Sequence, residues 1–250
     1  MPNVYLEGLI LILIYMIGWF VAANLSKNNS IVDIAWGSGF VLIAGWMQYF
    51  HPFEGQFILT TIVTIWGLRL AVYIFYRNMG KPEDWRYVEL RKSWGKTVVI
   101  QSFIKVFLFQ GFLLWVIALP LIPSQGIPLQ SGPLLYFGLF LWFFGFSWEA
   151  IADWQLLKFK CDRVNQGKIM TKGLWSYSRH PNYFGEIVLW WGIFFVALPL
   201  GPWYILIISP LTITFLLIKV SGVPLLESKY KDNPEYQEYK RKTSALIPGL

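Results

Sequence analysis

Near its start the chain carries the apolar run VYLEGLILILIYMIGWFVAANL, residues Val4–Leu25. An α-helix rises about 1.5 Å per residue, so a run of this length can cross a hydrocarbon core of roughly 30 Å. Val21–Ala23 loosely resembles the cleavage site of a signal peptide, but no basic residue precedes the run. We therefore expect a retained transmembrane helix here.

Six more apolar runs follow, and we expect each to span a membrane: Ile31–Phe50, Phe57–Tyr76, Val98–Leu119, Leu134–Leu157, Tyr183–Leu198 and Pro202–Val220. Hydrophobic residues make up 56% of the chain and charged residues only 14%, which is typical of a polytopic membrane protein. The sequence thus predicts an all-α fold, a bundle of about seven transmembrane helices in a single domain, residues 1–250. Because the sixth run is short, the last two could instead form one re-entrant hairpin.

The basic residues predict the orientation of this bundle. Nearly all of the 21 lysines and arginines fall in every second connection, whereas the connections around His51, Ser124 and Gly201 contain none. By the positive-inside rule, the N-terminus lies outside and the C-terminus is cytoplasmic. We expect an integral protein of a bacterial inner membrane. The net charge of +7 then reflects topology, and nucleic acid is not an expected partner.

A polar stretch precedes the sixth run and reads GLWSYSRHPNYFGE, residues Gly173–Glu186. Pro181 suits the first turn of a helix, because it lacks an N–H and has a fixed φ. Such a helix would direct its free N–H groups, with Arg179 beside them, at a phosphate or carboxylate. Asn182 and Glu186 share one helix face. The alternative is a basic surface loop in which Arg179 contacts lipid headgroups.

Polar residues also occur inside other predicted spans. Arg69 and Tyr73 form one stripe of the third run together with Trp66. An arginine at bilayer depth requires an anionic partner or ligand, and we favour a binding site for Arg69 and Tyr73 over structural pairing. Glu149 and Asp153 stand four residues apart near the end of the fifth run. They could pair with an arginine or accept hydrogen bonds from ligand hydroxyls.

Asp33 opens the second run and is equally consistent with a helix cap and with a site residue. Gly37 and Gly39 follow it and permit close helix contact, or leave room for a ligand. No metal site is expected, because His51 and His180 fall on opposite sides of the membrane and no Cys/His cluster has zinc spacing. The phosphate-binding glycine motifs of soluble folds are also absent from the sequence. Any cofactor must therefore be held by loops and helix ends.

Several motifs resemble those of the steroid 5-alpha-reductase-like membrane proteins, and more narrowly their bacterial, largely uncharacterised branch. They are Asp33–Gly37, Gly67–Arg69, Gly80–Tyr87, Arg179–Glu186 and the tail Tyr236–Pro248. The resemblance spans nearly the whole chain and is strongest in the second half. It implies a seven-helix membrane reductase that binds NADPH from the cytoplasmic side, with a cofactor-binding half at about residues 134–250.

The resemblance, together with the residue chemistry, predicts the site. Cofactor contacts are assigned to Arg69, Tyr73, Glu149, Asp153, Lys160, Lys168, Tyr177, Arg179, His180, Asn182, Tyr183, Glu186, Tyr239 and Arg241. Trp66 replaces the tyrosine that, in the steroid reductases, polarises the substrate ketone. We therefore assign the catalytic proton donor to Asp33 or Tyr73, and substrate contacts to Asp33, Trp36 and Trp66.

The leading hypothesis is an NADPH-dependent reductase of an activated C=C bond in a lipophilic substrate, steroid-like or isoprenoid. A buried donor would stabilise the developing enolate. The alternative is an S-adenosylmethionine-dependent methyltransferase of the isoprenylcysteine or phospholipid type, because Arg179–Gly185 also fits the Arg-His-Pro-x-Tyr-x-Gly pattern of that distantly similar group. Of the late carboxylate pair in that pattern, only Glu227 is present, next to Ser228. A third alternative is a non-catalytic lipid-binding protein.

Overall fold

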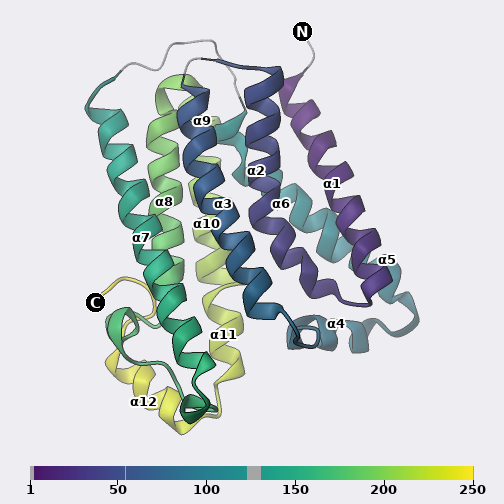
Figure 1. Ribbon diagram of the computed structural model, residues 1–250, viewed down its shortest axis with the longest axis vertical. Helices are drawn as coiled ribbons and strands as arrows, with labels where there is room; N and C mark the ends of the chain where they lie inside the picture. Colours follow the sequence, from purple (N-terminus) through teal and green to yellow (C-terminus); the bar gives the residue numbers. More distant parts are fainter. Residues whose placement is uncertain (1–2, 54, 123–130, 250) are drawn as a thin grey trace. The chain divides into compact units, whose positions relative to one another are not determined.

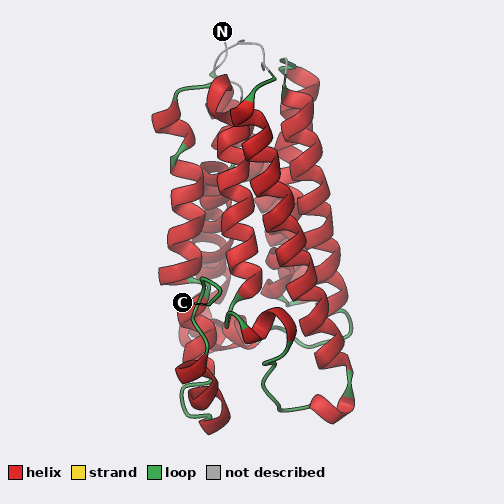
Figure 2. Ribbon diagram, turned by 90° about the vertical axis from the view of Figure 1, so that its left-hand side faces the viewer, coloured by secondary structure: helices red, strands yellow, loops and turns green. Residues whose placement is uncertain are grey.

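The computed structural model describes residues 3–53, 55–122 and 131–249, and the fold of these residues is all-helical. These residues form helices and connecting loops, and no strand occurs among them (Figure 2). Seven helical stretches are long and apolar enough to cross a membrane: Val4–Ser26, Asn29–Phe50, Gln56–Asn78, Trp85–Ile117, Pro133–Cys161, Pro181–Leu200 and Trp203–Lys229. The predicted fold class is confirmed, and the last two runs form two separate spans. The orientation stays a prediction, and Ser124 lies outside the described residues.

The chain divides into two compact units. Unit 1 contains Met1–Gln130 and Ala197–Ile208, and unit 2 contains Ser131–Val196 and Ser209–Leu250. Unit 2 thus takes in most of the half that the resemblance assigns to the cofactor. The prediction of one functional domain stays a prediction.

Unit 1 is built on α2 (Val32–Phe50) and α3 (Gln56–Asn78), which run side by side (Figure 1). A Cβ atom added to Gly37 would lie 2.6 Å from the Gly67 carbonyl oxygen, and one added to Gly67 would lie equally close to the Gly37 carbonyl oxygen. The predicted helix contact at Gly37 is therefore present, since small residues let helices approach this closely. The long helices of this unit also include α1 (Val4–Ser26).

The fourth span begins earlier than the apolar run predicts. Its first part is a helix of its own, α4 (Trp85–Trp94). The remainder comprises α5 (Val98–Ser102), a π-helical segment (Phe103–Leu108) and α6 (Phe109–Ile117). The prediction from apolar runs missed α4, because its sequence, WRYVELRKSW, is mostly polar. Gly80, with φ +71°, lets the chain leave α3 before α4 starts.

Unit 2 depends on an equally close contact between α7 (Pro133–Cys161) and α8 (Pro181–Ala197). A Cβ atom on Gly145 would lie 2.5 Å from the Gly185 carbonyl oxygen, and one on Gly192 would lie 2.7 Å from that of Gly138. Each helix spaces its two glycines seven residues apart, which places them on one face. The contact fixes the register of α7 against α8.

The remaining elements complete the two units. They are α9 (Trp203–Leu206), α10 (Ile208–Phe215), a π-helical segment (Leu216–Val220), α11 (Val223–Lys229) and α12 (Pro234–Lys242). Short 3-10 turns lie at Asn29–Ile31, Gly95–Thr97, Leu119–Leu121, Arg163–Asn165, Gly173–Ser176 and Leu198–Leu200. The last span breaks at Gly222, between the π-helical segment and α11. The close turn requires glycine, because a Cβ there would lie 2.3 Å from the Leu217 carbonyl oxygen.

Candidate functional site

The start of α8 carries a group of buried polar side chains. The helix begins at Pro181, as its position in the motif predicts. Arg179 is 7% exposed, His180 3% and Glu186 8%. The Ser178 hydroxyl accepts a hydrogen bond of 3.1 Å from the His180 N–H and so satisfies one of the free donors at the helix start.

The guanidinium of Arg179 is bound within unit 2. Its Nε and Nη2 atoms donate to Oε1 of Glu227 on α11 at 2.9 and 2.6 Å. Its Nη1 donates to the Lys240 carbonyl at 3.1 Å and to the Thr243 carbonyl. Charge-assisted bonds of this kind are strong. Arg179 therefore ties α11 and the end of α12 to the start of α8, instead of pointing freely at an external anion.

Glu227 lies at the centre of this group, although the sequence pointed to it only through the methyltransferase pattern and not as a predicted cofactor residue. Its Oε2 accepts a hydrogen bond of 2.5 Å from Nζ of Lys240, and its Oε1 lies 3.6 Å from Nε2 of His180. The last distance exceeds a hydrogen bond. One signal could have found it: Glu227 is the only acidic residue between Glu186 and Asp232.

The chain after α12 lies over the segment that leads into α8. Tyr239 donates its hydroxyl hydrogen to the carbonyls of Trp175 and, at 3.2 Å, Ser178. The Arg179 N–H donates to the Ser244 carbonyl at 2.9 Å, and the Ser178 hydroxyl donates to that of Ala245 at 3.3 Å. These bonds close the C-terminal segment over the start of α8 within unit 2.

Raising the pH is expected to weaken this closure. Burial raises the pKa of Tyr236 to about 12, helped by the negative charge of Glu227, and burial also raises the pKa of Tyr239. Both tyrosines hold their proton more tightly in the folded chain than in the unfolded chain, where the pKa is about 10. Stability should therefore be constant below about pH 10 and fall as the pH rises above it.

Thermal unfolding of the purified protein between pH 8 and 11.5 measures this effect. Tyr239→Phe should start from a lower melting temperature, because two hydrogen bonds are lost, and then decline less steeply. Tyr177→Phe is the control, since the Tyr177 side chain is 59% exposed. Equal slopes for wild type and Tyr239→Phe would contradict the prediction.

Three buried carboxyl groups lie on the contacting helices α7 and α8. Glu149 is 2% exposed and Asp153 3%, and Glu186 follows one turn after Asn182. Nδ2 of Asn182 donates to Oδ1 of Asp153 at 3.3 Å. A Cβ on Gly185 would lie 2.6 Å from the Glu149 backbone nitrogen. The glycine contact thus brings together the residue types that the sequence predicted as a site: carboxylates that accept hydrogen bonds and an amide that can also donate them.

Comparison with known proteins places the chain in a family. Residues 19–243 match DUF1295, which is described as a protein of unknown function. The chain belongs to the DUF1295 family. It is also 27% identical over 195 residues to an uncharacterised protein of Schizosaccharomyces pombe, a match that covers 66% of this chain and 56% of the relative. The chain therefore spans little more than half of that relative's length. No solved structure matches it.

Unit 2 of this DUF1295 protein also contains other predicted cofactor residues, some in contact with one another and some exposed. The Tyr183 ring stacks on the His180 ring, with centroids 5.5 Å apart and planes inclined by 6°. Within the described part of the chain, neither ring nitrogen of His180 makes a hydrogen bond. Four of the predicted residues are exposed: Lys160, Lys168, Tyr177 and Arg241. Their assigned roles stay predictions.

Unit 1 holds the remaining predicted residues. Trp66 is fully buried, and its ring packs edge-on against Phe40 at 5.4 Å, while Trp36 packs against the same Phe40 at 5.6 Å. Arg69 and Tyr73 are half-buried on α3. A pocket that joins them to the start of α8 stays a prediction of the sequence.

Asp33 connects the first turn of α2 to α4. Its Oδ1 accepts from the Tyr87 hydroxyl at 2.8 Å, and its Oδ2 accepts from Nη2 of Arg86 at 2.7 Å. Nε of Arg86 also donates to Asp84, the N-cap of α4, at 2.9 Å. Asp33 does not cap α2, whose N-cap is Ile31. Its contacts are those of a hydrogen-bond acceptor that holds α4 in place, and the catalytic role assigned to it stays a prediction.

Proposed function

We propose that this DUF1295 protein is a membrane reductase that uses NADPH to reduce an activated C=C bond in a lipophilic substrate. One observation carries most of the weight: Glu149, Asp153 and Glu186 are all buried on α7 and α8, with Asn182 bonded to Asp153. Carboxyl groups inside a membrane helix pair are costly, and chains that retain them usually use them. The resemblance to the steroid 5-alpha-reductase-like proteins supports the same reading.

The residue chemistry fits a dinucleotide. Ribose hydroxyls and the nicotinamide group would bond to the carboxylates and to Asn182, and exposed basic residues such as Lys160, Lys168 and Arg241 would attract the phosphates. When bound, NADPH supplies the hydride, and the chain binds it and excludes water. Of the two predicted proton donors, Tyr73 is the better, because both Asp33 oxygens already accept hydrogen bonds.

A cofactor titration tests the proposal. We expect NADPH to quench the tryptophan fluorescence of the protein in lipid nanodiscs, and Asn182→Ala or Asp153→Asn to weaken that binding by about tenfold or more, as expected for hydrogen bonds to charged groups. Asn24→Ala is the matched control, because the exposed Asn24 side chain donates to the Phe20 carbonyl within its own helix. Unchanged NADPH affinity in both site variants would show that the site is misplaced.

A methyltransferase that uses S-adenosylmethionine is the second candidate. The observation that favours it is Glu227, whose carboxylate binds Arg179 and lies near His180 of the shared motif. Titration with S-adenosylmethionine under the same conditions separates the two, and selective binding of the methyl donor would replace the reductase proposal. Binding of neither cofactor would leave the third alternative, a non-catalytic lipid-binding protein.

A further inference from the structure

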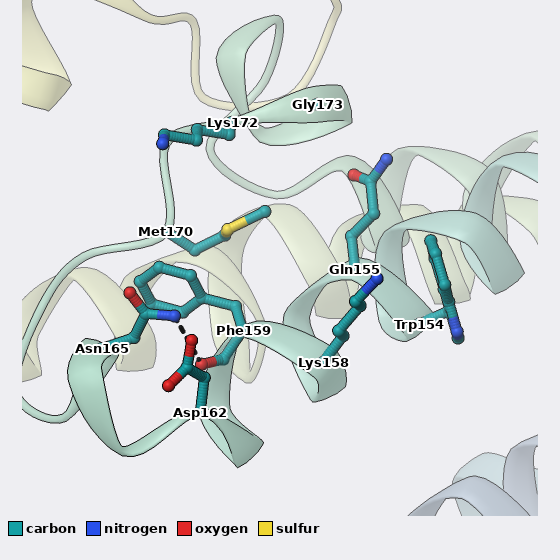
Figure 3. Close-up of a pocket in the computed structure, with 9 residues that line it drawn as sticks. All are labelled: Trp154, Gln155, Lys158, Phe159, Asp162, Asn165, Met170, Lys172 and Gly173. Carbon is teal, nitrogen blue, oxygen red and sulfur yellow. Dashed lines mark hydrogen bonds between the residues drawn. The ribbon is translucent and has the colours of Figure 1, made fainter.

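A cavity of about 390 Å³ opens to the surface at the end of α7 (Figure 3). Trp154, Lys158 and Phe159 form its wall on the last turns of α7, and Met170 and Lys172 form the facing wall on the following loop. Apolar and aromatic groups thus alternate with two cationic ones. Lys158 and Lys172 are both exposed, and Nζ of Lys158 lies 5.2 Å from the centre of the Trp154 ring.

Hydrogen bonds at both ends of the cavity connect α7 to the chain that follows it. Oε1 of Gln155 accepts a hydrogen bond of 2.9 Å from the Leu174 N–H. Gly173 allows this approach, since it has φ +63° and a Cβ there would lie 2.6 Å from the Gln155 amide. At the other end, Nδ2 of Asn165 donates to the Phe159 carbonyl at 3.2 Å. The cavity is therefore built into the fold of unit 2.

The cavity lies on another side of α7 from Asp153 and Asn182 of the candidate cofactor site. Successive residues of an α-helix are rotated by about 100° around its axis. Lys158 is five residues beyond Asp153, so it points about 140° away from the face that carries Asp153 and contacts α8. A ligand in the cavity would thus occupy a different side of α7 from one bound at Asn182.

The face of α7 that carries the cavity continues along the helix as an exposed apolar surface. Phe144, Ile151 and Lys158 are spaced seven residues apart and so share one face. Phe144 is 39% exposed, Ile151 46% and Trp154 58%. The 29 residues of α7 exceed the roughly 20 that a membrane requires. We therefore expect its last turns, which carry Trp154 and Lys158, to lie in the headgroup region, where tryptophan and lysine side chains are favoured.

We propose that this cavity binds the phosphate of an anionic phospholipid between Lys158 and Lys172, with an acyl chain lying along Ile151 and Phe144. The two positive charges favour binding of the lipid phosphate, and the exposed apolar face of α7 favours contact with the acyl chain. Asp162 also lines the cavity and accepts the Val164 N–H at 3.0 Å. Its carboxylate favours a headgroup that carries hydroxyl groups, as phosphatidylglycerol does.

Lipid retention tests the proposal. The full chain is purified from nanodiscs of phosphatidylcholine with a minor share of phosphatidylglycerol, and the retained lipid is measured by mass spectrometry. We expect wild type to retain phosphatidylglycerol selectively, and Lys158→Gln with Lys172→Gln to lower its affinity by about fivefold for each lysine. Arg163→Gln with Lys231→Gln removes the same charge outside the cavity and should retain the lipid. Equal loss in both double variants, or no loss in either, would overturn the proposal.

A competition experiment distinguishes the lipid from other phosphates. Inorganic phosphate or NADPH is added at millimolar concentration before the lipid is measured. We expect neither to lower the retained phosphatidylglycerol. Displacement to the level of the cavity variant by either one would show that the cavity serves a soluble phosphate, and the lipid proposal would be wrong. The NADPH titration of Asn182→Ala is independent of this result, so the two proposals can fail separately.

Discussion

Replacing Arg179 with alanine is expected to lower the free energy of unfolding by about 3 kcal/mol and to release the C-terminal segment from the start of α8. The reason is that the Glu227 side chain, which is only 13% exposed, would lose its guanidinium partner while remaining largely buried. The value is at the lower end for a broken buried ion pair, because Lys240 still binds Glu227. The carbonyls of Lys240 and Thr243 would also lose their donor. Hydrogen exchange measured by mass spectrometry over residues 234–249, together with thermal unfolding, reports both effects.

Three further variants show whether the ion pair is responsible. Arg179→Lys should give an intermediate loss, because lysine keeps the charge but not the forked geometry. Adding Glu227→Gln to Arg179→Ala should cost less than the sum of the two single changes, since the two side chains bind each other. Lys242→Ala is the control, because its pair with Glu238 is exposed and contributes little. If the C-terminal segment of Arg179→Ala exchanged hydrogen at the wild-type rate, the predicted role of Arg179 in holding that segment would be contradicted.

Replacing Gly145 with alanine is expected to be about as damaging, although it adds only one carbon atom. The new Cβ would lie 2.5 Å from both the Gly185 carbonyl oxygen and the Leu189 nitrogen. These are backbone atoms and cannot move without separating α7 from α8. We expect the free energy of unfolding to fall by about 3 kcal/mol, at the upper end for overpacking. This corresponds to a melting temperature lower by roughly 10 °C. Circular dichroism in detergent would measure it.

The chain offers matched controls for this substitution. Gly18 on α1 and Gly45 on α2 also lie inside helices, and a Cβ added to either meets no atom within 4 Å. Gly18→Ala and Gly45→Ala should be neutral or should stabilise the protein by up to about 1 kcal/mol, because alanine favours the helix. If Gly145→Ala proves no worse than these two variants, the close contact is not important for stability.

The glycine contact also connects fold and site. It places Glu149 one turn beyond Gly145, and Asn182 one turn before Glu186, on helices whose backbones touch. Separation of α7 and α8 should therefore weaken cofactor binding as well as stability. A variant such as Asn182→Ala, which keeps the contact, should affect binding alone.

The sequence by itself determined the features that depend on short stretches of chain. Apolar runs predicted the seven spans, because length and hydropathy suffice to place a helix in a membrane. Pro181 predicted the start of α8, and helical spacing placed Glu149 beside Asp153. The same local reasoning missed α4, whose polar sequence lacks a spanning signal and which is held by the contacts of Arg86 and Tyr87 with Asp33.

Only the tertiary structure decided which partners the polar side chains take. Arg179 and Glu227 are 48 residues apart in sequence, and they meet because the last span breaks at Gly222 and α11 turns toward α8. Asp153 meets Asn182 because four glycines bring α7 and α8 into contact. A buried charge takes whichever partner the packing of the helices places within reach. For that reason Arg179 holds the C-terminal segment in the folded protein, whereas the sequence predicted that it would bind a phosphate.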